Sequence, residues 1–115
     1  MSDNKFSLEN VKKFSENTAS RNRWRVNPDS DFRESVEEGL FENYKQYGYL
    51  VCPCREAWGS REKDRDIICP CEYCADDIIE FGHCYCALYM SEAFIASGEE
   101  PGSIPERRDQ KLMPD

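Results

Sequence analysis

The chain has 115 residues, a net charge of −8 and a charged fraction of 33%. This length fits one domain and excludes a second catalytic domain, and the acidic balance makes nucleic acid an unfavourable partner. No apolar run fits a signal peptide or a membrane span, so the sequence predicts a cytoplasmic protein without a membrane contact.

The first expected element is a helix over residues 8–19. Ser7 can cap this helix, and Phe6 and Val11 have the spacing of a hydrophobic staple. The basic segment over residues 21–25 interrupts the apolar pattern, so the helix is expected to end before it.

A second helix is expected to begin at Asn27-Pro28, because proline suits the first turn of a helix. Apolar side chains then recur every three or four residues, and Gly48 can end the helix in the left-handed conformation. These side chains are Phe32, Val36, Leu40, Tyr44 and Tyr47. Core packing explains such a stripe, so we assign no function to it.

Short segments rich in glycine, proline and cysteine follow over residues 51–90, a pattern typical of loops around a metal centre. Two short helices are expected, over residues 75–81 and 90–96, and Gly98 can end the second one. Beyond Pro101 the chain is polar, and Ile104-Pro105 is its expected anchor.

All seven cysteines lie between Cys52 and Cys86, so they form one site. Six of these cysteines form three pairs with a single intervening residue, and Cys74 belongs to none of them. The pairs are Cys52-Pro53-Cys54, Cys69-Pro70-Cys71 and Cys84-Tyr85-Cys86. In a reducing cytosol, an odd number of clustered cysteines favours metal ligation or redox catalysis. Zinc sites usually leave two to four residues between cysteines. An iron–sulfur cluster takes four thiolates, and two of the remaining three cysteines can form a redox pair.

These pairs, with proline inside the first two, resemble the catalytic subunit of ferredoxin:thioredoxin reductase. The similarity extends to Glu38-Gly39-Leu40, to the segment Leu50–Arg55 and to the segment Ser103–Glu106, and so covers about residues 8–108. The resemblance implies that Cys52, Cys69, Cys71 and Cys84 bind a 4Fe-4S cluster, while Cys54 and Cys86 form the active disulfide.

The resemblance also implies an activity and partners. We expect an oxidoreductase that takes electrons from ferredoxin and reduces the disulfide of thioredoxin or a thioredoxin-like protein, with a companion subunit in some members of the family. The alternative is a zinc-binding structural or interaction module without catalysis. Iron and sulfide analysis separates the two.

Two residues beside the third pair need separate interpretation. Tyr85 stands where the family commonly has a histidine, and His83, the only histidine, lies on the other side of Cys84. His83 is interpreted either as a packing residue or as the group that handles a proton in place of the missing histidine.

Cys74 makes a Cys-x-x-Cys pair with Cys71. This spacing allows a competing ligand set in which Cys74 replaces Cys69 or Cys84. The simpler interpretation is a buried cysteine that packs as a small apolar residue.

Two groups of arginines are candidate contacts for an acidic ferredoxin. One group lies at residues 21, 23 and 25 beside Trp24, and the other at residues 55, 61 and 65. A solvated face explains them equally well. We also expect Arg55 to lower the pKa of the adjacent Cys54 thiol.

Together these features predict a mainly α fold: a small single domain of short helices and loops folded around an iron–sulfur cluster. We expect order from about residue 8 to residue 108, followed by a short mobile C-terminal tail.

Overall fold

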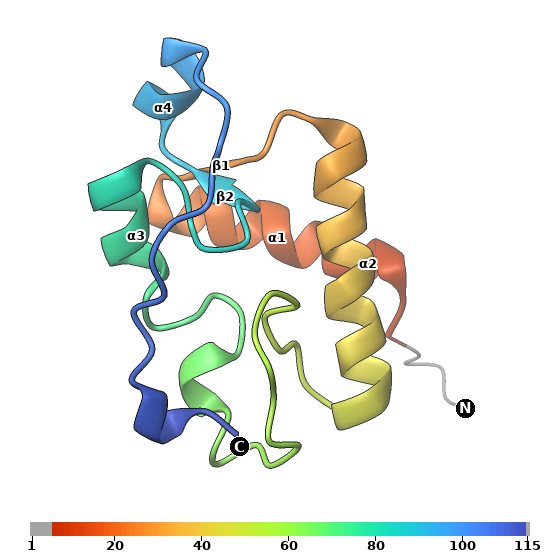
Figure 1. Cartoon of the computed structure of the whole chain (residues 1–115). Helices are drawn as coiled ribbons and strands as arrows, with labels where there is room; N and C mark the ends of the chain where they lie inside the picture. Colours follow the sequence, from red (N-terminus) through yellow and green to blue (C-terminus); the bar gives the residue numbers. More distant parts are fainter. Residues whose placement is uncertain (1–5, 115) are drawn as a thin grey trace.

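The computed structural model describes residues 6–114. Within that range the elements are α1 (Leu8–Asn22), β1 (Arg25–Val26), α2 (Ser30–Tyr47), the 3-10 helix η1 (Arg65–Ile67), α3 (Cys74–Phe81), β2 (Tyr89–Met90), α4 (Glu92–Ser97) and the 3-10 helix η2 (Gln110–Leu112) (Figure 1). The predicted mainly α class is confirmed. None of the described helices is long and apolar enough to cross a bilayer.

The helix α1 begins where predicted. The Ser7 side chain accepts a hydrogen bond from the Asn10 amide, and the Asn10 side chain accepts one from the Ser7 amide at 2.8 Å. The helix runs on to Asn22 and ends at Arg23 in the left-handed conformation (φ 62°). The predicted interruption from residue 21 is wrong, because arginine is a good helix former when its side chain is exposed.

The helix α2 begins at Ser30, two residues after the predicted Pro28. Asp29 is its N-cap, and the Asp29 side chain accepts a hydrogen bond from the Phe32 amide at 3.2 Å. Asn27-Pro28 therefore precedes the helix. Gly48 ends the helix in the left-handed conformation (φ 88°), as predicted.

The apolar stripe of α2 is only partly core. Val36 and Leu40 are buried, whereas Phe32, in the first turn of α2, is 41% exposed. A charged side chain is also buried in the interface between α1 and α2. Glu37 is 1% exposed and accepts a hydrogen bond from the Ser15 hydroxyl of α1 at 2.6 Å.

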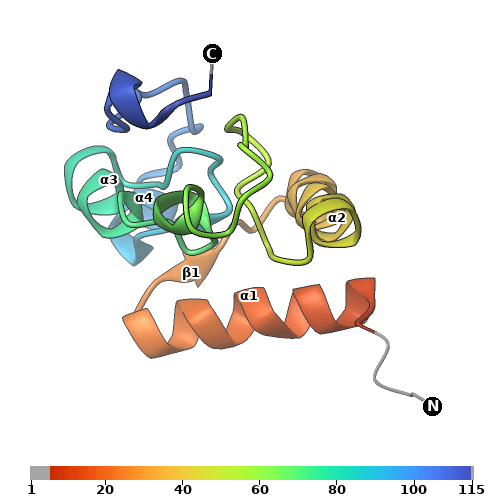
Figure 2. The same cartoon turned by 90° about the horizontal axis from the view of Figure 1, so that it is seen from below.

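The helix α1 lies along one side of the molecule, and α2, α3 and the loops between them lie on the other side (Figure 2). The main core lies between these parts. Its buried members include Val11, Ala19, Val36, Leu40 and Leu88 together with Cys52, Cys74, Cys84 and Cys86. The cysteine-bearing segments are therefore part of the core.

A two-stranded antiparallel sheet, absent from the sequence-based expectations, joins Arg25–Val26 to Tyr89–Met90. Met90 belongs to this sheet, so the helix predicted from residue 90 begins at Glu92. Ser91 caps the helix and Gly98 ends it, as predicted for Gly98.

Ion pairs hold the C-terminal segment. Arg107 pairs with Asp77, and the buried Arg108 pairs with Asp66 at 2.8 Å. The expectation that Ile104-Pro105 alone anchors the tail is wrong, because partners thirty or more residues away leave no local sequence signal. Two expectations stay predictions. One is that the last residues are mobile, and the other is that the chain forms a single domain ordered over about residues 8–108.

Candidate functional site

Six of the seven cysteines line one small enclosed space. They are Cys52, Cys69, Cys71, Cys74, Cys84 and Cys86, and the side chains of Arg55, Tyr85 and Tyr89 complete the lining with Pro70. The structure thus brings together all four predicted cluster ligands and one of the two predicted redox cysteines. The other redox cysteine, Cys54, lies at the edge of this site.

A short backbone ladder places the first two cysteine pairs beside each other. The Cys52 amide donates to the Ile67 carbonyl at 2.9 Å, and the Cys69 amide donates to the Leu50 carbonyl at 2.8 Å. An antiparallel bridge lies between these two bonds. The Cys69–Pro70 peptide bond is cis.

The helix α2 supports the first pair through Gly39. A Cβ atom at Gly39 would lie 2.8 Å from the Cβ atom of Pro53, closer than real Cβ atoms approach one another. Only glycine therefore lets α2 lie this close to the Cys52-Pro53-Cys54 turn.

The third pair lies in a tight turn beside the sheet. The Ala87 amide donates to the Cys84 carbonyl at 2.8 Å, and the Asn27 side chain donates to the Ala87 carbonyl at 2.9 Å. Ala87 itself is in the left-handed conformation (φ 59°). The Tyr89 amide lies 3.4 Å from Cys84 Sγ and can donate to it. Tyr89 of β2 thus contacts Cys84 directly, while Asn27, which follows β1, holds the end of the same turn at Ala87.

Cys74 is the first residue of α3, which begins one residue before the predicted helix over residues 75–81. Its side chain is buried, and its thiol interacts with the Cys84 thiol. Cys74 therefore shares the enclosed space with the predicted ligands, and the competing ligand set that includes it stays open.

Cys54 and Cys86 differ in exposure although their thiols interact. Cys54 is exposed, whereas Cys86 is buried. Interactions with Cys52 and then Cys86 lower the pKa of Cys54 to about 4, and Arg55 makes a smaller contribution in the same direction. Hydrogen bonding to Cys52 and Cys54 raises the pKa of Cys86. The exposed member of the pair thus takes the thiolate form most readily.

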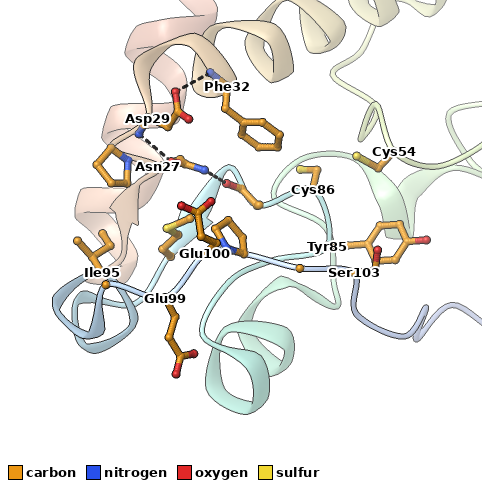
Figure 3. Close-up of a pocket in the computed structure, with 16 residues that line it drawn as sticks. Asn27, Asp29, Phe32, Cys54, Tyr85, Cys86, Ile95, Glu99, Glu100 and Ser103 are labelled. Atoms are coloured by element: carbon orange, nitrogen blue, oxygen red, sulfur yellow. Dashed lines mark hydrogen bonds between the residues drawn. The ribbon is translucent and has the colours of Figure 1, made fainter.

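A groove of about 660 Å³ opens beside Cys54 and Cys86 (Figure 3). Phe32 lies on one side of this groove, and Glu99 and Glu100 lie near its other end. Among its lining residues in the described chain, none is lysine, arginine or histidine. The groove therefore combines an exposed thiol and an apolar ring with negative charge farther along its lining.

His83 lies outside this groove. Its buried ring packs edge-on against Phe94, with 5.4 Å between the ring centroids, and its Nδ1 atom lies 2.8 Å from the Cys84 carbonyl oxygen. These contacts favour the packing interpretation. Tyr85, in contrast, lines both the groove and the enclosed cysteine space.

The predicted surface role of Arg55 is wrong. Its side chain is 2% exposed, because it turns inward to pair with Glu106. It therefore offers no charge to an approaching ferredoxin. The other arginines proposed for that contact, at residues 21, 23, 25, 61 and 65, are exposed.

The donor chemistry of the site fits an iron–sulfur cluster. Cysteine thiolates are the usual ligands of such clusters, and this space is lined by thiols with hydrogen-bond donors around them. One example is the Tyr89 hydroxyl, 3.6 Å from Cys69 Sγ. Over residues 6–114, no three histidine, cysteine, aspartate or glutamate side chains are arranged to hold a single metal ion.

A search of curated proteins finds no match to this chain. A family model described as the ferredoxin thioredoxin reductase catalytic beta chain matches residues 1–106. This range includes all seven cysteines and the Glu106 partner of Arg55. The family comprises oxidoreductases that bind an iron–sulfur cluster and have ferredoxin and thioredoxin as partners. The match confirms the resemblance: this chain belongs to the family of the ferredoxin thioredoxin reductase catalytic beta chain.

Proposed function

We propose that this chain takes electrons from ferredoxin and uses them to reduce the disulfide of thioredoxin or a thioredoxin-like protein. The proposed cofactor is a 4Fe-4S cluster held by Cys52, Cys69, Cys71 and Cys84, and the proposed redox-active disulfide is Cys54–Cys86. One observation carries the proposal: an exposed thiol interacts with a buried thiol that itself lines a space shared with five other cysteines.

The two redox cysteines can divide the exchange between them. Cys54 is exposed, and its lowered pKa favours the attacking thiolate. The Cys54 sulfur attacks one sulfur of the partner disulfide, which forms a mixed disulfide and releases one partner thiolate. The Cys86 thiolate then attacks the Cys54 sulfur, which releases the second partner thiolate and forms the Cys54–Cys86 disulfide.

Returning that disulfide to two thiols takes two electrons and two protons. A bound iron–sulfur cluster supplies electrons singly, as a ferredoxin delivers them. Cys86 is the redox cysteine on the inner side, with its Sγ 3.9 Å from Cys84 Sγ. Its burial keeps it away from other protein thiols, so Cys54 alone meets the substrate.

The groove beside Cys54 is the proposed place for the substrate segment that carries the disulfide. Phe32 offers an apolar contact, and the carboxylates of Glu99 and Glu100 favour basic side chains in the part of the substrate that lies farther along the groove from Cys54. Ferredoxin and any companion subunit need other surfaces. The exposed Arg61 and Arg65 are candidate contacts for an acidic ferredoxin.

The test is an anaerobic preparation analysed for iron, sulfide and zinc, followed by an assay with reduced ferredoxin and oxidised thioredoxin. We expect iron and sulfide with brown absorption. Cys54→Ser should keep the cluster but abolish thioredoxin reduction, whereas Cys69→Ser should lose the cluster. Zinc in place of iron and sulfide would contradict the proposal and support a structural zinc module.

A further inference from the structure

Arg55 directly follows the exposed Cys54, but its side chain turns into the molecule. Its Nη1 atom lies 3.3 Å from Cys71 Sγ and 3.8 Å from Cys52 Sγ. Only 2% of the side chain is exposed. This guanidinium is therefore a buried positive charge in contact with two of the proposed ligand sulfurs.

Three other residues fix the direction of the guanidinium. Its Nε and Nη2 atoms donate to the two carboxylate oxygens of Glu106, at 2.7 and 2.6 Å. Its Cζ atom lies 4.3 Å from the ring centre of Tyr85 and 5.2 Å from that of Tyr73. A bidentate ion pair with a carboxylate fixes the plane of an arginine guanidinium group, and the faces of aromatic rings stabilise its positive charge. Nη1 is consequently held toward the sulfurs.

We propose that Arg55 is a positioning residue that raises the reduction potential of the iron–sulfur cofactor at Cys52 and Cys71. This inference rests on the proposed function. Reduction adds negative charge to the site, and both a fixed positive charge and N–H donation to the ligand sulfurs stabilise that charge. Hydrogen bonds to ligand sulfurs and net charge are known determinants of cluster potentials. Burial strengthens both effects, because water screens them less.

This role differs from activation of the nucleophile. The exposed thiol of Cys54 owes its lowered pKa first to Cys52 and Cys86, and only to a lesser extent to Arg55. The N–H groups of Arg55 instead meet Cys71, Cys52 and Glu106. Lysine cannot reproduce this arrangement, because one ammonium group cannot bind a carboxylate through two parallel bonds and still face two sulfurs.

The test is a redox titration of the anaerobically purified, cluster-loaded protein, followed by EPR or visible absorption. Arg55→Gln removes the positive charge, and Arg55→Lys keeps the charge but removes the planar guanidinium group. We expect a lower midpoint potential in both variants, with the larger shift in Arg55→Gln. The matched control is Arg61→Gln, which removes an exposed arginine and should leave the midpoint potential unchanged.

A cluster-loaded Arg55→Gln variant with the midpoint potential of the wild-type protein would overturn the inference. If Arg55→Gln does not retain iron, Arg55→Lys decides the question by the same measurement. These outcomes differ from failure of the proposed function, which would appear as wild-type protein without iron and sulfide. A purely structural role of Arg55 predicts lower thermal stability with an unchanged potential.

Discussion

Replacement of Gly39 by alanine tests whether close packing of α2 positions the first cysteine pair. The new Cβ atom would lie 2.8 Å from the Pro53 Cβ and 3.4 Å from the Pro53 Cγ. Neither partner can yield easily, because one belongs to a helix and the other to a rigid ring. Restoring ordinary van der Waals contact requires α2 and the Cys52-Pro53-Cys54 turn to separate by about 0.6 Å or more.

Two opposing effects decide the magnitude. Alanine in a helix interior is favoured over glycine by about 1 kcal/mol, whereas an extra methyl group in a packed site costs about 1–3 kcal/mol. We therefore expect Gly39→Ala to lower the free energy of unfolding by about 1 kcal/mol, with a decrease in Tm of about 4 °C. The displaced Cys52 should also reduce the iron retained by the purified protein.

Urea and thermal unfolding, together with iron analysis, measure both effects. The matched control is Gly102→Ala, because no atom lies within 4 Å of the Cβ position there. This control should change the free energy of unfolding by less than about 0.5 kcal/mol. If Gly39→Ala instead gained about 1 kcal/mol and kept its full iron content, helix propensity would be the only effect and the packing argument would be refuted.

Three further variants or treatments test the site and its supports. Limited alkylation of the reduced protein should modify Cys54 before Cys86, because only Cys54 is exposed, and peptide mass mapping that finds Cys86 labelled first would reverse their roles. Arg108→Ala should lower the free energy of unfolding by about 3 kcal/mol, because Asp66 loses its buried partner; a urea midpoint equal to that of the wild-type protein would contradict this. Cys74→Ser should keep the full iron and sulfide content, and loss of the cluster would instead support the competing ligand set.

Local signals in the sequence predicted much of the helical structure. The caps at Ser7 and Gly48 and the short helix near residues 75–81 depend on neighbouring residues only, so pattern and chemistry identify them. The β1–β2 sheet escaped prediction because each strand has only two residues, too few for an alternating pattern. Glu37 escaped because a buried carboxylate depends on a partner in another helix.

The same distinction holds at the site. The spacing of the cysteines indicated one centre, and the structure places six of them around one space. The position of Cys74 within that space depends on how α3 begins, which spacing alone does not determine. The inward turn of Arg55 depends on Glu106, fifty-one residues later in the chain. The orientation of side chains whose partners lie far away in the chain thus could not be predicted from the sequence.

The ion pairs of the C-terminal segment also have a consequence for biosynthesis. Glu106, Arg107 and Arg108 leave the ribosome after all seven cysteines, so the pairs of the two arginines with Asp66 and Asp77 can form only after every cysteine has been synthesised. Until these ion pairs form, the cysteine-bearing loops are not held by contacts with the C-terminal segment. The cysteine site is therefore more open while this segment is still being synthesised than it is once these ion pairs have formed.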